Sequence, residues 1–218
     1  MKVDVRLNAI VDPERANGRS LSELTHLVVA GGATLIQLRD KHGATRQMIE
    51  EARAIKAALA GTGVRLVVND RVDVALVAGA DGVHLGQEDM RVEDARRLLG
   101  PGAIIGLSIK TVALANAAPL EQLDYVGVGG VYATTSKDNP NKPIGVNGLR
   151  DIVAAFRARK RDLPVCGIAG IDAGNAAPVI AVGADGVAVI SALSMKSDPE
   201  AAARELRGVV DAALKARS

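Results

Sequence analysis

The hydrophobic pattern of the chain alternates in a regular way. Short apolar runs rich in valine and isoleucine are each followed by a longer segment that mixes alanine and leucine with charged residues. The short runs predict strands and the longer segments predict helices. The predicted strands cover residues 3–10, 35–40, 64–69, 82–86, 104–110, 125–132, 165–170 and 187–191. The predicted helices include residues 22–30, 46–59, 91–99, 149–159, 173–182 and 199–216.

Residues suited to cap a helix N-terminus precede three of these helices. Ser20 or Ser22 stands before the first, Asp172 before the one at 173–182, and Ser197 or Asp198 before the last. Side-chain oxygens at this position accept a backbone N–H of the first helical turn. We therefore expect helices to begin at these points.

Near-continuous apolar strands that alternate with helices indicate parallel pairing, with the helices covering the sheet. Eight such units in 218 residues favour a closed (β/α)₈ barrel, the α/β fold called the TIM barrel, as a single domain over residues 1–218. An open doubly wound sheet is the alternative, but it usually carries a glycine-rich fingerprint after its first strand. Asp12-Pro13-Glu14-Arg15 stands there instead.

One short segment occurs twice. Gly79-Ala80-Asp81-Gly82 recurs as Gly183-Ala184-Asp185-Gly186, four predicted units later, and each copy leads into a strand. A duplicated half-barrel predicts such an echo. Common turn chemistry predicts it equally, because glycine tolerates the left-handed backbone at helix ends.

The second predicted strand is polar for a buried one. In Leu35-Ile36-Gln37-Leu38-Arg39-Asp40-Lys41, side-chain alternation places Gln37, Arg39 and Lys41 on one face. Active sites of such barrels form at the carboxyl ends of the strands, and other predicted strands also end in polar residues. These ends carry Asn69-Asp70, His84 to Asp89, Ser108 and Lys110, Thr134-Thr135-Ser136-Lys137, Gly170, and Ile190-Ser191.

These residues sort by chemistry around the predicted rim. Asp70 and Asp89 come from neighbouring strands and suit an oxygen-ligated cation such as Mg²⁺. Arg39, Lys41 and Lys137 can complete an anion site around it. Backbone amides and hydroxyls from Thr134, Ser136, Gly170, Ile190 and Ser191 predict a second anion site, where barrels commonly bind phosphate.

Composition removes several classes of function. The only aromatic residues are Tyr125, Tyr132 and Phe156, and the net charge of +2 is spread along the chain, so we expect no nucleic-acid partner. No stretch of about 18 apolar residues and no signal-peptide pattern occurs, so we expect no membrane contact and a cytoplasmic location. Cys166 is predicted to be a small buried apolar residue, and His26, His42 and His84 to be structural or solvated rather than zinc ligands.

Taken in order, the motifs resemble those of the thiamine-phosphate synthase (thiamine-phosphate pyrophosphorylase) family. Any one of them is unspecific, whereas the ordered set is specific. The matching stretches are 37–41, Val68-Asn69-Asp70, 83–89, Gly106-Leu107-Ser108, 124–127, 134–137, 167–171 and 183–186.

The resemblance implies a transferase that joins an aminopyrimidine diphosphate to a thiazole phosphate by a dissociative route with Mg²⁺, giving thiamine phosphate and diphosphate. It assigns the pyrimidine to Gln37 and the diphosphate to Arg39, Lys41, Asn69, Ser108 and Lys137, with Leu38 and Asp40 in the same substrate-binding segment. Of these, Arg39, Lys41, Lys137 and Ser108 are the expected catalytic residues. Asp70 and Asp89 are the expected metal ligands. The resemblance assigns the thiazole phosphate to Thr134, Ser136, Gly170, Ile190 and Ser191, and Thr135 is a further expected substrate-binding residue.

The chain departs from the family pattern at several places. Asp40 stands where glutamate is frequent, Gly130 and Ala133 where prolines are, and Ser136 where threonine is. The first strand lacks an aromatic residue, which leaves that wall of the pyrimidine pocket undefined. Three alternatives remain open: a thiazole tautomerase-like isomerase, a non-catalytic phosphometabolite-binding protein, and a sugar-phosphate epimerase or isomerase. A homo-oligomer is compatible with the sequence.

Overall fold

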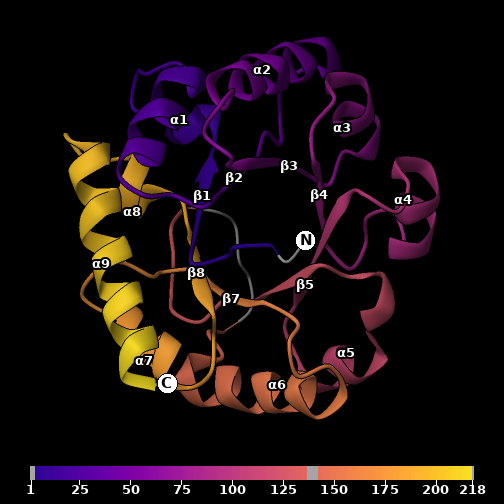
Figure 1. The fold of residues 1–218 in the computed structure, drawn as a ribbon, viewed down its shortest axis with the longest axis vertical. Coiled ribbons are helices and arrows are strands. Elements are labelled where there is room, and N and C mark those ends of the chain that lie inside the picture. The colour runs from indigo at the N-terminus through magenta and orange to yellow at the C-terminus, as the bar shows by residue number, and fades with distance from the viewer. Residues whose placement is uncertain (1–2, 137–141, 218) are drawn as a thin grey trace.

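Eight parallel strands pair in sequence order and the last pairs with the first, so the sheet closes into a barrel with the helices outside it (Figure 1). The computed structural model describes residues 3–136 and 142–217. The predicted (β/α)₈ architecture is confirmed. The strands are β1 Leu7–Val11, β2 Leu35–Leu38, β3 Arg65–Asn69, β4 Gly82–Leu85, β5 Ile104–Ile109, β6 Tyr125–Gly129, β7 Val165–Ile168 and β8 Gly186–Val189.

The main helices follow the strands in the predicted order. They are α1 Leu21–Ala30, α2 Thr45–Ala58, α3 Val72–Ala78, α4 Val92–Leu99, α5 Val112–Ala117, α6 Gly145–Arg159, α7 Ala176–Ala181, α8 Ser191–Ser194 and α9 Pro199–Arg217, with short 3₁₀ turns at Pro13–Arg15 and Leu120–Gln122. Within the described residues, no helix combines the length and apolar character needed to cross a membrane.

The predicted helix caps are partly confirmed. The Ser20 side chain accepts the Glu23 N–H at 3.2 Å and Asp198 accepts the Ala201 N–H at 2.9 Å, so α1 and α9 begin where expected. The prediction that Asp172 caps a helix over residues 173–182 is wrong. Its carboxylate accepts the Gly174 N–H and shapes a turn, and α7 begins only after Asn175.

The N-terminal strand was predicted several residues too early. β1 begins at Leu7, and the apolar residues Val3 and Val5 instead pack against the cluster inside the barrel. Figure 1 shows this N-terminal segment crossing the barrel opening. The two valines are apolar because they close the bottom of the barrel interior. Apolar residues with this role cannot be told from a short buried strand by sequence alone.

Side chains alternate between the barrel interior and the helical layer. In β2, Leu35 belongs to the interior cluster, whereas Ile36 and Leu38 pack with the helices. Gln37 has the parity of Leu35 and is 2% exposed. The alternation predicted for the second strand is therefore confirmed, and it directs an amide into the barrel.

A repeated side-chain link closes the end of the barrel opposite the carboxyl ends of the strands. The residue just before each even-numbered strand accepts a backbone N–H from the first or second residue of the preceding odd-numbered strand. We call these four residues the clamp residues. They are Thr34 on Leu7 at 3.0 Å, Asp81 on Leu66 at 2.8 Å, Asp124 on Ile105 at 2.9 Å, and Asp185 on Val165 at 2.9 Å.

The clamp gives a physical reason for the repeated Gly-Ala-Asp-Gly segment. Asp81 and Asp185 are both clamp residues, and the glycines after them, Gly82 and Gly186, leave no room for a side chain. A Cβ at either glycine would collide with a neighbouring backbone carbonyl. The repeated segment therefore has the same structural role in both places, whether or not the halves arose by duplication.

Candidate active site

The predicted site residues gather at one end of the barrel, where the strands end. Gln37 lies near the end of β2, Asn69 closes β3, and Ser108 lies near the end of β5. Ile190 lies between β8 and α8, and Ser191 is the first residue of α8. The carboxyl ends of the parallel strands bring together residues far apart in the sequence.

A cluster of opposite charges occupies the rim over β2 to β4. The Lys41 ammonium forms an ion pair with the Asp70 carboxylate, and Asp89 accepts the Gly86 N–H at 2.6 Å. Burial, and after it the contact with Asp89, raises the pKa of Asp70, against the effect of Lys41. Asp70 also holds a positive φ of 63°, a conformation that costs a non-glycine residue energy.

This carboxylate pair fits a hard cation. Two adjacent acidic groups that repel one another are stabilised when a cation binds between them. No cluster of three or more acidic, histidine or cysteine ligands occurs within residues 3–136 and 142–217. Mg²⁺ needs only one or two carboxylates because it keeps water and phosphate oxygens as its other ligands.

Arg39 has a partner that the sequence analysis did not identify. Its guanidinium pairs with the carboxylate of Asp12, whose side chain is 2% exposed, and Asp12 also accepts the Glu14 N–H at 3.0 Å. The register Val11↔Leu38 between β1 and β2 puts the two residues side by side. The signal in the sequence was the Asp-Pro pair directly after the first strand.

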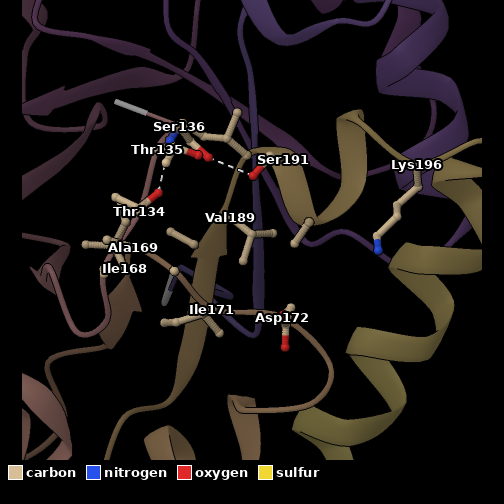
Figure 2. A pocket seen from close by; sticks show the side chains of 15 residues that line it. Thr134, Thr135, Ser136, Ile168, Ala169, Ile171, Asp172, Val189, Ser191 and Lys196 are labelled. Carbon is tan, nitrogen blue, oxygen red and sulfur yellow. Dashed lines mark hydrogen bonds between the residues drawn. The ribbon is translucent and has the colours of Figure 1, made fainter. Parts of the chain in front are cut away.

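A cavity of about 460 Å³ lies on the opposite side of the rim, over β6 to β8 (Figure 2). Hydroxyl groups gather at one edge of it, where Ser136 Oγ lies 2.7 Å from Ser191 Oγ and Thr134 Oγ1 accepts the Ser136 N–H at 3.1 Å. The five residues assigned to the thiazole phosphate line this cavity, together with the expected substrate-binding residue Thr135. They are Thr134, Thr135, Ser136, Gly170, Ile190 and Ser191.

The floor of this cavity is built from unusual backbone. Ala169 and Gly170 both have positive φ, 81° and 66°. A Cβ at Gly170 would lie 2.7 Å from that of Tyr132 and closer still to the Ala133 carbonyl, so only glycine fits. The loop after β7 thereby packs directly against the loop after β6.

Two charged residues that line the cavity were not predicted. Lys196 follows α8, and Asp172 follows β7. Figure 2 shows both on the side of the cavity away from Thr134. Lys196 lies beyond the last predicted strand end, and Asp172 was interpreted as a helix cap, so neither was assigned to the site.

Three of the expected binding residues behave differently from the others. The Leu38 side chain packs into the helical layer, so only its backbone faces the rim. Asp40 turns its carboxylate back onto its own loop and accepts the N–H groups of His42 and Gly43 at 3.0 and 2.7 Å. Lys137 lies outside the described residues.

His84 is buried inside the barrel, in line with a structural rather than a zinc-binding role. Its Nδ1 lies 2.8 Å from the Tyr125 hydroxyl and its Nε2 lies 2.9 Å from Ser108 Oγ. These two contacts were not predicted, because together they join three different strands. Cys166 is also buried inside the barrel as expected, and burial raises the pKa of its thiol.

Comparison with known proteins identifies the family. The family model described as thiamine monophosphate synthase matches residues 7–193. A thiamine-phosphate synthase of Agrobacterium fabrum is 53% identical over 216 residues, which are 99% of this chain and 98% of the relative. One from Moorella thermoacetica is 47% identical over 204 residues, covering 94% and 95%. Among solved structures, a thiamine phosphate pyrophosphorylase from Pyrococcus furiosus has a TM-score of 0.84 and 37% identity, covering 97% and 98% of the two chains. The chain belongs to the thiamine monophosphate synthase family of transferase enzymes.

Proposed function

We propose that this chain transfers the aminopyrimidinylmethyl group from its diphosphate to the ring nitrogen of a thiazole phosphate, giving thiamine phosphate and diphosphate. The observation that carries the proposal is the division of one barrel mouth into two halves. Charged groups gather over β2 to β4, and a hydroxyl-lined cavity lies over β6 to β8. Two phosphorylated substrates need two such sites, facing each other.

The charged half suits the pyrimidine diphosphate. Gln37, directed into the barrel, can meet the ring of the pyrimidine with an amide that both donates and accepts. Arg39 and Lys41 follow Gln37 along the chain, Asn69 ends β3 and Ser108 lies near the end of β5. We assign these four residues and Lys137 to the diphosphate. A ligand with a flat ring at one end and a diphosphate at the other matches this order of residues.

Asp70 and Asp89 would hold Mg²⁺ in this half. When bound, the ion supplies positive charge to the oxygens of the departing diphosphate. Lys41 pairs with Asp70 in the structure described here. With Asp70 engaged in holding the ion, Lys41 would be free to turn to a phosphate oxygen of the leaving group.

The cavity over β6 to β8 suits the thiazole phosphate. Its hydroxyls from Thr134, Ser136 and Ser191 donate to phosphate oxygens, as do the N–H groups around Gly170. The bond between Ser136 and Ser191 holds two of these donors at one point. A phosphate entering there would replace that mutual bond by one from each hydroxyl.

The chemistry needs no general base. The carbon–oxygen bond to the diphosphate breaks and its electron pair leaves with the diphosphate oxygen. The lone pair of the thiazole nitrogen then forms the new carbon–nitrogen bond, and no proton has to be removed. Groups that bind the growing negative charge on the leaving group more tightly than the substrate lower the barrier. In this proposal Arg39, Lys41 and Ser108 supply these groups.

Two other functions fit the same fold. A thiazole tautomerase-like isomerase would use the hydroxyl-lined cavity but would not need Asp70, Asp89 and Lys41. A non-catalytic phosphometabolite-binding protein would bind both ligands without turnover. The paired carboxylates beside a lysine disfavour the first, and the assay below separates both from a synthase.

The decisive experiment incubates the purified protein with both substrates, with Mg²⁺ or with a chelator, and measures thiamine phosphate. We expect product only when Mg²⁺ is present. Asp89→Asn should lower turnover by about a hundredfold or more. The matched control is Asp94→Asn, which removes a carboxylate paired with Arg97 on the outer face of α4 and should leave turnover unchanged. Absence of product under all conditions would refute the proposal, and a thiazole isomer or simple binding would establish one of the two rivals.

A further inference from the structure

Three polar side chains form a chain of hydrogen bonds through the barrel interior. The Tyr125 hydroxyl lies 2.8 Å from His84 Nδ1, and His84 Nε2 lies 2.9 Å from Ser108 Oγ. Tyr125 is fully buried, His84 is buried, and Ser108 is half-buried near the mouth. The chain therefore runs from the closed part of the barrel up to a residue at the proposed diphosphate site.

The barrel leaves space for this arrangement with two glycines. A Cβ at Gly106 would lie 2.6 Å from His84 Nδ1, and it would also collide with the Tyr125 ring. A Cβ at Gly127 would lie 3.0 Å from His84 Cε1. Because these strands carry no side chain there, the imidazole ring lies across the interior with a partner at each nitrogen.

Which group donates in each of these hydrogen bonds follows from Tyr125, at the buried end of the series. Burial raises the pKa of the Tyr125 hydroxyl well above its usual range, so the hydroxyl keeps its proton. Among the described residues, His84 Nδ1 is the one hydrogen-bond partner of that hydroxyl. A buried O–H without an acceptor is costly, so Tyr125 donates to Nδ1.

The same logic fixes the other nitrogen. A neutral imidazole that accepts at Nδ1 carries its proton on Nε2. That N–H then donates to Ser108 Oγ and uses one of its lone pairs. The serine's own proton is left to point away from His84, toward a ligand in the mouth. A phosphate oxygen only accepts, so a serine that meets one has to donate.

We propose that Tyr125 and His84 are positioning residues that hold Ser108 with its hydroxyl proton directed at the diphosphate of the pyrimidine substrate. This inference rests on the function proposed above. An isolated serine hydroxyl rotates and must be oriented when charge develops. A hydroxyl held as a donor beforehand stabilises the charge on the leaving oxygens without that reorganisation.

The first test is a double-mutant cycle on the intact protein. Tyr125→Phe removes only the hydroxyl that sets the imidazole proton. We expect kcat to fall about three- to tenfold, the worth of one neutral hydrogen bond, with an unchanged KM for the thiazole phosphate. In a Ser108→Ala background the same substitution should cost nothing further, because the group being oriented is absent.

Tyr132→Phe provides the matched control. Tyr132 donates to the Asn175 carbonyl at 3.3 Å and takes no part in the hydrogen bonds that link Tyr125, His84 and Ser108. Its removal should change kcat by the same factor in both backgrounds. Equal losses from Tyr125→Phe with and without Ser108 would overturn the inference, since a structural role alone gives additive losses.

The second test does not depend on turnover. The chain contains three histidines, so ¹⁵N spectra of the imidazoles are simple, and His84→Gln identifies the signal of interest. We expect a neutral His84 protonated at Nε2 and a shift toward mixed tautomers in Tyr125→Phe. Protonation at Nδ1 would overturn the inference. A wild-type protein that makes no thiamine phosphate overturns the proposed function and the role toward diphosphate with it. An active protein with additive losses overturns only the inference.

Discussion

The ion pair between Asp12 and Arg39 offers a measurable link between the site and the stability of the fold. The Asp12 side chain is 2% exposed and that of Arg39 15%, so removing the carboxylate leaves a guanidinium largely without water or a counter-charge. Asp12→Ala also removes the acceptor of the Glu14 N–H. The substitution therefore breaks two interactions of different kinds.

The magnitude can be worked out from these two contacts. Breaking a buried ion pair by deleting one partner costs about 3–5 kcal/mol. Because water reaches part of Arg39, we take about 3 kcal/mol, at the lower end of that range. Loss of the N-cap acceptor adds about 1 kcal/mol. The free energy of unfolding should fall by about 4 kcal/mol, which lowers the melting temperature of a chain of this size by roughly 8–16 °C.

Two further variants separate the contributions. Asp12→Asn keeps an oxygen for the Glu14 N–H but removes the charge, so it should cost about 3 kcal/mol. Asp198→Ala removes an exposed cap on the Ala201 N–H and no ion pair, so it should cost about 1 kcal/mol. Arg39→Met should cost little in the Asp12→Asn background, because the unpaired charge is then gone.

Urea unfolding followed by far-ultraviolet circular dichroism is the suitable assay, since the chain has no tryptophan. The slopes of the unfolding curves should match among the variants. If Asp12→Ala loses no more stability than Asp198→Ala, the pair is not a buried interaction and the reasoning fails.

Three other predictions concern two residues of the site and a buried amide in β1. Burial, and after it the contact with Asp89, raises the pKa of Asp70, so the folded state holds the proton of this carboxyl more tightly than the unfolded state does. The metal-free protein should therefore lose stability as the pH rises above the usual pKa of an aspartate. Asp89→Asn should flatten that part of the profile and abolish the rise in melting temperature on adding Mg²⁺; a variant that still responds to Mg²⁺ contradicts the assignment. Ser191→Ala should raise KM for the thiazole phosphate roughly tenfold, because one donor beside Ser136 is lost, and steady-state kinetics should show KM for the pyrimidine diphosphate unchanged. Asn8→Leu should stabilise the protein in urea by about 1–3 kcal/mol, because neither polar atom of this buried amide has a partner among the described residues; a loss of stability would mean that the amide is satisfied.

The barrel could be predicted because its signals are local. Strand alternation and side-chain parity are properties of consecutive residues, and they predict that Gln37 and Leu38 lie on opposite faces of the second strand, as the structure has them. Strand ends likewise share one rim by topology alone. The polar residues at these ends were therefore predictable as a group.

The features that the sequence did not predict depend on which strands are neighbours in the sheet and on the register in which they pair. Asp12 meets Arg39 only because Val11 pairs with Leu38 in the sheet. His84 reaches Tyr125 and Ser108 across neighbouring strands, which no sequence spacing reveals. Apolar character was also ambiguous at Val3 and Val5, because a plug inside the barrel and a strand in its wall bury the same kinds of side chain.

The four clamp residues divide the chain into modules. Each clamp joins an odd-numbered strand to the residue before the next even-numbered strand, so the link lies inside one β-α-β quarter of the barrel. New chain ends placed between quarters, such as at the exposed Gly61–Gly63 turn before β3, leave every link within a continuous piece. A break between Leu66 and Asp81 would cut one. The barrel is thus built to tolerate circular permutation at quarter boundaries, and two fragments divided there carry the side-chain links needed to reassemble.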